Sequence, residues 1–453
     1  MTRDDAQISV TPQWSDESKD VHIGTFTLEG DGDYMITADY TDKSGNEMEQ
    51  YASQQITIDT EDPVISVSDI VAGSASKEEK YGFTITAEDQ NLDGGTFEAS
   101  LTAVEQNENG SFETKEIPLG TARAVEAGRI YTYTVENLPD DAIYTLSCSV
   151  TDMAGHTTQK FSLADGSEYE NVQFSINRHG SNFLLDADTE ELTAQYYVYS
   201  VENDVIVREI NVDVVEDYTV RLNDEVLSEN RDYKTQLSGG DGQWSERDYI
   251  IDKNLFQEEG EYYLTVESKD KTETVAYSDV KNAGVAFVVD QSAPIVTITG
   301  LKQQGRYQTD EKTVSVMPTD EGGKLNSFAA IVLDSDGNPI KNVAGEDISR
   351  RVELTGEDLL TQLADNDGKI TFTVPEGLDM QVQIICTDCA MQPDGSTNEY
   401  NELFQEITVS PSQWIMFYAN KPLFYGAIAV VCVPVAGGTA WILLRRKRKI
   451  LKK

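Results

Sequence analysis

The sequence predicts an all-β chain of tandem sandwich domains that ends in one C-terminal helix. Three observations support this prediction: an internal repeat of about 115 residues, an alternation of apolar and polar side chains inside each copy, and a 22-residue run without charge near the C-terminus. Self-similarity at a fixed period indicates one structural unit copied in series. Alternation with a period of two residues is the pattern of a half-buried β-strand.

The repeat is most visible at one aspartate per copy. These aspartates lie 110, 118 and 118 residues apart: Asp42, Asp152, Asp270 and Asp388. Eight residues before each of them stands a large side chain that opens an alternating strand: Tyr34, Tyr144, Tyr262 and Met380. We expect these large side chains to face the core and the aspartates to begin the turn that follows the strand.

The residues around the central tyrosine of each copy indicate the type of sandwich. The segment Asp140-Asp-Ala-Ile-Tyr144-Thr-Leu146 resembles the tyrosine corner of immunoglobulin-like domains. The resemblance implies a buried ring whose hydroxyl bonds to the backbone of the preceding turn. Antibody domains have a cysteine where this chain has Leu146, so each sandwich is expected to hold together by packing without an inter-sheet disulfide.

The turn motifs extend this resemblance to a family. Thr41-Asp-Lys-Ser-Gly-Asn46 and Thr151-Asp-Met-Ala-Gly-His156, with Asp-rich segments leading to Pro63 and Pro294, are similar to the bacterial immunoglobulin-like repeats of large Gram-positive surface proteins. The resemblance covers about residues 1–410 and is weaker in the last two copies, where Lys271 replaces a turn residue. It implies extracellular stalks, adhesins and spacers of surface enzymes, and it specifies no ligand.

Prolines at the junctions suggest the domain boundaries, because proline borders a strand more readily than it sits inside a sheet. The expected divisions are a partial domain with only its C-terminal strands, three complete immunoglobulin-like domains, a juxtamembrane segment, a transmembrane helix and a basic tail: 1–60, 61–177, 178–290, 291–410, 411–422, 423–444 and 445–453. The partial first domain, together with the lack of an apolar leader in residues 1–10, leads us to expect that the natural chain starts earlier.

The C-terminal segment predicts a membrane anchor. The run from Leu423 to Leu444 has no charge, and about 20 such residues span a bilayer as a helix. Trp441 stands near its end, and a basic tail begins with Arg445, Arg446 and Lys447. By the positive-inside rule the tail would be cytoplasmic. The sequence therefore predicts a single-pass protein of the plasma membrane that contacts lipid through this helix and displays its immunoglobulin-like domains outside the cell.

Charge excludes one class of partner. The chain has 80 acidic and 35 basic residues, and seven of the basic ones lie in the last nine positions. The remaining domains therefore carry about 52 net negative charges. A field of this sign repels nucleic acid and attracts divalent cations.

One loop is a candidate calcium site. Asp89, Asn91 and Asp93 have the spacing of the first ligands of an EF-hand loop, and oxygen ligands suit calcium. The flanking residues alternate as strands and not as helices, so an EF-hand is excluded. A looser calcium site and a solvated acidic loop are both compatible with the pattern. No other cofactor is expected.

No constellation of residues predicts catalysis. The chain has three histidines, His22, His156 and His179, and no nucleophile elbow or phosphate-binding loop. Cys386 and Cys389 have the spacing of a redox pair but no surrounding βαβ pattern, so they are expected to form a local disulfide or to remain two free thiols.

These features favour a non-enzymatic cell-surface stalk or adhesin whose partner is a host or matrix protein or a glycan. The alternative is the spacer and anchor fragment of a larger, carbohydrate-active surface enzyme with its catalytic domain upstream. A third possibility is direct sugar binding through Trp14 or Trp244, although their matching repeat positions favour a structural role.

Overall fold

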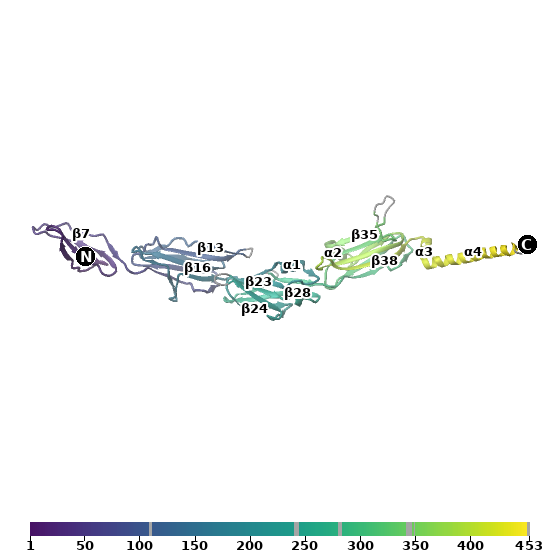
Figure 1. The fold of residues 1–453 in the computed structure, drawn as a ribbon, viewed down its shortest axis with the longest axis horizontal. Helices are drawn as coiled ribbons and strands as arrows, with labels where there is room; N and C mark the ends of the chain where they lie inside the picture. The colour runs from purple at the N-terminus through teal and green to yellow at the C-terminus, as the bar shows by residue number, and fades with distance from the viewer. Residues whose placement is uncertain (108–110, 240–243, 280–282, 341–346, 348, 451–453) are drawn as a thin grey trace.

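The computed structural model describes residues 1–450 except 108–110, 240–243, 280–282, 341–346 and 348. Strands make up 50% of the chain and helices 12%, so the chain is mainly β. Four β-rich units lie end to end in chain order and form an extended array (Figure 1). We call them the first, second, third and fourth units.

The first unit is small and poorly buried. Tyr34 is its only large apolar side chain in the core, and its sheet has the order β2-β1-β5-β8 beside two hairpins. Its strands are β1 Thr2–Arg3, β2 Ala6–Gln7, β3 Gln13–Asp16, β4 His22–Thr25, β5 Gly32–Met35, β6 Thr37–Ala38, β7 Tyr51–Ala52 and β8 Ile56–Ile58. Because these strands are only two to four residues long, this unit encloses little apolar surface.

The second unit is a sandwich of two sheets, ordered β10-β20-β16-β12-β13 and β14-β15-β11-β9-β18-β19. One core cluster runs from Ile65 to Ile176 between them, because alternate residues of each strand face inward. Its strands are β9 Val64–Val67, β10 Ala75–Ser76, β11 Phe83–Glu88, β12 Glu98–Gln106, β13 Phe112–Ile117, β14 Arg123–Glu126, β15 Ile130–Val135, β16 Ala142–Thr151, β17 Thr157–Thr158, β18 Phe161–Leu163, β19 Glu168–Tyr169 and β20 Asn171–Ile176.

The third unit repeats this plan and adds a short helix, with a core cluster between Phe183 and Val289. Asp186 caps the helix by accepting a hydrogen bond from the Thr189 amide. Its elements are β21 Asn182–Leu185, α1 Ala187–Gln195, β22 Tyr197–Val198, β23 Val205–Asn211, β24 Val215–Leu222, β25 Glu225–Val226, β26 Tyr233–Gly239, β27 Ser245–Ile251, η1 Lys253–Phe256, β28 Gly260–Asp270, β29 Val275–Tyr277 and β30 Val285–Val289.

The fourth unit has its core cluster between Leu301 and Val409. One of its sheets continues into the third unit, since β22 pairs with both β30 and β37, the latter at Val198 and Met391. Its elements are β31 Ile295–Thr299, β32 Arg306–Tyr307, β33 Lys312–Thr319, β34 Leu325–Leu333, β35 Arg351–Thr355, α2 Gly356–Asp365, β36 Ile370–Val374, β37 Gly377–Met391 and β38 Thr397–Val409.

The corner tyrosines open strands at equivalent places in the first three units. The Tyr34 hydroxyl donates to the carbonyl oxygens of Glu29 (2.9 Å) and Gly30 (2.7 Å). The Tyr144 and Tyr262 hydroxyls donate to the carbonyls of Asp140 and Glu258, each at 2.9 Å. The rings of Tyr144 and Tyr262 also stack on a core phenylalanine of the neighbouring strand. In the fourth unit Met380 is buried at this position and lacks the hydroxyl.

The expectation of a C-terminal transmembrane helix is wrong. The chain does end in two helices, α3 Gln413–Ala419 and α4 Lys421–Ile450. However, within the part of the chain that the structure describes, no helix combines the length and the apolar character needed to cross a bilayer. Crossing the hydrocarbon core takes about 20 consecutive, predominantly apolar residues in one helix.

The predicted position in the plasma membrane is therefore wrong as well. The single-pass plasma-membrane position, the lipid contact and the cytoplasmic tail all depended on it. Leu423 and Trp441 lie exposed on α4, and the Arg445 guanidinium stacks 4.3 Å from the centre of the Trp441 ring. Arg446 and Lys447 continue the same helix.

Replacing Tyr144 tests the role of the corner. Tyr144→Phe should remove one hydrogen bond and lower the free energy of unfolding by about 0.5–1.5 kcal/mol. Tyr144→Ala should also remove the buried ring and cost about 3–5 kcal/mol. Calorimetry of the full chain should show one early transition, which hydrogen exchange would locate in the second unit. Val125→Ala, at a side chain 66% exposed in the same unit, is the control. A Tyr144→Ala profile identical to wild type would contradict the core position.

Candidate metal centres at the unit junctions

Each junction between units places three polar side chains at equivalent positions. One lies directly after the last strand of the preceding unit, one at the end of a strand of the following unit, and one is the repeat aspartate. The three sets are Asp59, Asp89 and Asp152; Asn177, Asn211 and Asp270; and Asp290, Asp320 and Asp388. Segments that are distant in sequence therefore meet at every joint.

The junction of the third and fourth units contains three carboxylates. One oxygen from each of Asp290, Asp320 and Asp388 lies within 4.8 Å of the others, and Asp290 and Asp388 are buried. Among the described residues, no ion pair involves any of the three. Asn398 is the main neutral contact: its amide donates to Asp388 Oδ2 at 2.9 Å and to the Asp290 carbonyl at 3.2 Å.

Burial and mutual repulsion alter the acidity of this group. Burial, with the charges of Asp290 and Asp388, raises the pKa of Asp320 to about 6. Burial also raises the pKa of Asp388 to about 6, against the opposing effect of the Asn398 hydrogen bond. Burial raises the pKa of Asp290 as well. Carboxylates that gather without a cation carry this cost whenever they ionise.

The junction of the second and third units has amides in place of two carboxylates. The Asn177 side-chain amide donates to Asp270 Oδ2 (2.9 Å) and to Asn211 Oδ1 (3.0 Å). The Asn211 amide donates to Asp270 Oδ2 (3.3 Å) and to Ser181 Oγ (2.8 Å). All three junction residues are buried, and a single carboxylate receives hydrogen bonds from both amides. This joint is held by direct hydrogen bonds within the chain.

The junction of the first and second units is more open and includes a histidine. Asp59, Asp152 and His156 form a second group of close ligand atoms. The Asp152 carboxylate accepts hydrogen bonds from the His156 ring (2.8 Å) and from the backbone amides of Gly155 and His156. These bonds lower the pKa of Asp152 despite its burial, and the ring's bond to Asp152 raises the pKa of His156. When its nitrogen faces the two carboxylates, the Asn91 side-chain amide can donate to Asp89 and Asp59, whose oxygens lie 2.9 and 2.6 Å away. An acidic hollow of about 560 Å³, lined by Asp31, Glu61 and Asp62 among others, lies beside them.

The calcium candidates proposed from sequence are therefore only partly brought together. Burial, together with the nearby charge of Asp59, raises the pKa of Asp89, and Asn91 lies at the same joint. Asp93 instead bonds the Gly95 amide of its own loop at 3.0 Å and belongs to no ligand group among the described residues. Sequence spacing within one loop could not reveal Asp59 and Asp152, which come from other segments.

The repeat aspartate of the first unit has a local role. Asp42 accepts hydrogen bonds from the amides of Ser44 and Asn46, each at 2.8 Å, and from the Asn46 side chain at 2.7 Å. The bond from the Asn46 side chain is the main cause that lowers the pKa of Asp42. Asp42 thus closes a turn.

The cysteines form no disulfide in this structure. Cys386 and Cys389 are both free, with Cys386 buried and Cys389 half-buried. They lie three residues apart on β37, so their side chains point to opposite faces of the sheet. This alternation keeps the two sulfur atoms apart.

Trp244 is part of an interface. It is buried, its indole N–H donates to the Val104 carbonyl of the second unit at 2.8 Å, and its ring lies 5.7 Å from that of Phe112. Ile143, Ile210 and Val212 complete a small apolar cluster across the junction. Trp244 therefore offers no surface for a sugar, whereas Trp14 is 70% exposed on the β3–β4 hairpin.

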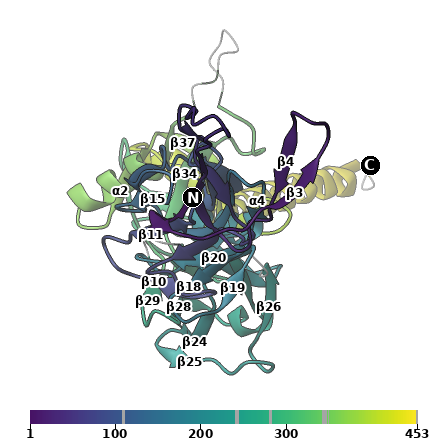
Figure 2. The same cartoon turned by 90° about the vertical axis from the view of Figure 1, so that its left-hand side faces the viewer.

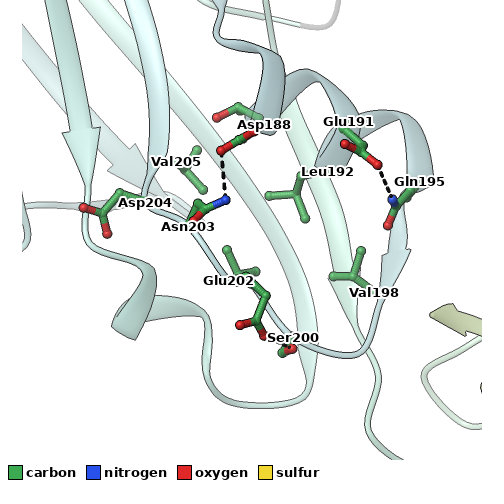
Figure 3. A pocket seen from close by; sticks show the side chains of 12 residues that line it. Asp188, Glu191, Leu192, Gln195, Val198, Ser200, Glu202, Asn203, Asp204 and Val205 are labelled. Carbon is green, nitrogen blue, oxygen red and sulfur yellow. Dashed lines mark hydrogen bonds between the residues drawn. The ribbon is translucent and has the colours of Figure 1, made fainter. Parts of the chain in front are cut away.

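The third unit contains a hollow lined mainly by polar side chains (Figure 3). It has a volume of about 240 Å³ and lies between α1 and the loop that leads into β23. Its polar side chains bond to one another: Asn203 donates to Asp188 at 2.8 Å and Gln195 to Glu191 at 3.2 Å. The lining contains no histidine, cysteine or cationic residue, and the hydroxyl of its one serine, Ser200, donates to the Glu202 carboxylate at 2.5 Å.

Comparison with known proteins adds little. No family model and no curated protein matches the sequence. A solved structure described as that of a 1.5-MDa bacterial ice-binding adhesin is 12% identical and covers 78% of this chain and 100% of its own, with a TM-score of 0.21. At this low TM-score, the function of the chain has to be argued from its own residues.

Trp244 should hold the second and third units in line. Trp244→Ala should broaden the distribution of particle dimensions in X-ray scattering of the full chain, because the joint loses its apolar contact and the bond to Val104. The blue-shifted tryptophan fluorescence should disappear, since the other three tryptophans are exposed. Trp14→Ala is the matched control and should change neither measurement. If the distribution of particle dimensions of Trp244→Ala equals that of wild type, contacts other than those of Trp244 hold the second and third units in line.

Proposed function

We propose that this chain is a non-enzymatic, adhesin-type surface protein, in which immunoglobulin-like units hold a binding surface away from the cell. The observation that carries the proposal is the extended series of β-rich units (Figure 1), with side-chain contacts across its second and third joints. An array of this kind separates its two ends by the length of several domains.

Contacts at the joints support a stalk with limited bending. Lys77 of the second unit donates to the Thr272 carbonyl of the third unit at 2.6 Å. Arg178, in the linker, donates to the carbonyls of Glu78 (2.8 Å) and Leu138 (2.7 Å). The Arg178 bonds fix the linker to the second unit, and the Lys77 bond reaches from the second unit to the third, so together they restrict rotation at this joint. The net charge of −45 adds repulsion along the array, which also opposes folding back.

The first unit is the favoured binding region. Its β3–β4 hairpin projects from the body of the unit (Figure 2) and exposes Trp14, Val21 and Ile23. Tyr40 and Tyr51 are also exposed in this unit. Exposed aromatic side chains are frequent anchors in contacts with proteins and sugars. The expected partner is therefore a host or matrix protein or a glycan.

A bead assay tests this role. Beads carrying the full chain, attached by its C-terminal end, should adhere to panels of immobilised matrix proteins or glycans. Trp14→Ala should weaken adhesion at least about tenfold, as removal of a central aromatic anchor does. Trp414→Ala, at a tryptophan 80% exposed at the opposite end, should have no effect.

Failure of the wild-type beads to adhere to any surface would contradict the adhesive role. In that case the spacer of a larger surface enzyme would be the better description of the same array. Equal weakening by both tryptophan substitutions would instead show non-specific hydrophobic adhesion and would contradict the assignment to the first unit.

A further inference from the structure

Within the described parts of the chain, no positively charged side chain pairs with the carboxylates at the centre of the joint between the third and fourth units. Asp290 is 3% exposed, and its Oδ2 has no hydrogen-bond partner. Oδ2 of the half-buried Asp320 also has none. A buried carboxylate oxygen without a partner is costly, and native proteins normally satisfy such atoms with a donor, a water molecule or an ion.

The two unsatisfied oxygens face the same space. A Cβ atom at Gly323 would lie 1.8 Å from Asp290 Oδ2 and 2.7 Å from Asp320 Oδ2, so only glycine lets this loop approach them. Asp388 brings a third carboxylate within 4.8 Å of both. Three hard oxygen donors thus converge from the linker, from the end of β33 and from β37.

The neighbouring joint shows what replaces a cation. There Asn177 and Asn211 occupy the positions of Asp290 and Asp320, and their amides donate to Asp270. The change from two carboxylates to two amides removes two negative charges and supplies the missing hydrogen-bond donors. The second joint therefore has one carboxylate that accepts hydrogen bonds from two amides, whereas the equivalent third joint has three carboxylates.

We propose that Asp290, Asp320 and Asp388 bind one calcium ion, which joins the linker to the fourth unit and limits bending at this joint. Calcium accepts carboxylate ligands in irregular arrangements, whereas magnesium demands a near-ideal octahedron and keeps its water. The ion holds Asp290 against the fourth unit, while the Asp290 amide donates to the Val198 carbonyl of the third unit at 2.9 Å. This inference does not depend on the adhesive role.

The test exchanges the two kinds of joint in the full chain. Wild type is titrated with calcium by calorimetry up to about 10 mM, because extracellular calcium modules bind at about 0.1–1 mM. The variant Asp290→Asn with Asp320→Asn copies the middle joint and should bind one calcium ion fewer. The reciprocal variant Asn177→Asp with Asn211→Asp should bind one more. Any calcium ions bound at the first junction are counted equally in wild type and variants, because the residues of that junction are unchanged, so they do not affect the difference in stoichiometry.

Scattering provides a second measurement. Calcium should narrow the distribution of wild-type dimensions, and magnesium at equal ionic strength should not. The Asp290→Asn, Asp320→Asn variant should have a narrow distribution of dimensions without calcium, and calcium should not change that distribution. If circular dichroism shows that this variant is unfolded, Asp320→Asn alone is measured against the same expectation. Equal calcium stoichiometry in wild type and variant, or an equal response to magnesium, would overturn the proposal.

Discussion

The hydrogen bond from each corner tyrosine to the preceding backbone positions the strand on which the rest of its unit depends. In the second unit, Tyr144 bonds Asp140 at one end of the sandwich, and β16 then carries alternate core residues toward the other end. Eight residues later, at about 3.3 Å per residue, the chain has advanced about 26 Å and reaches Asp152. The corner and the junction are therefore opposite ends of one rigid strand.

This coupling explains why the repeat aspartates meet the preceding unit. Asp152 lies near Asp59, Asp270 near Asn177, and Asp388 near Asp290, each partner directly following the last strand of the unit before. A one-residue slip of the strand would move the aspartate to the other face and break the joint as well as the core. Core packing and the alignment of the units consequently rest on the same register.

Because the chain is strongly acidic, the joints are the places where negatively charged side chains are brought closest together. Each joint gathers polar groups from three segments, and the chain treats the resulting charge in three ways. At the first joint His156 and Asn91 lie against the carboxylates, and at the second joint two asparagines donate hydrogen bonds to one carboxylate. At the third joint two carboxylate oxygens have no hydrogen-bond partner. Among the described residues, sheet pairing between neighbouring units occurs at this third joint alone, through β22, where two carboxylate oxygens lack a hydrogen-bond partner. The joints therefore differ in chemistry although the units share one plan.

Much of the β-architecture could be read from the sequence, because a two-residue alternation and a corner tyrosine are local patterns with one physical meaning. The separation of Cys386 from Cys389 also follows from alternation, once β37 is known to run through both. The clusters at the joints depended on the tertiary structure alone. Asp290, Asp320 and Asp388 are 30 and 68 residues apart, and the burial of Trp244 depends on a strand of another unit. Sequence determines which way a side chain points on its strand, but only the packing of one unit against the next decides which charges must share a site.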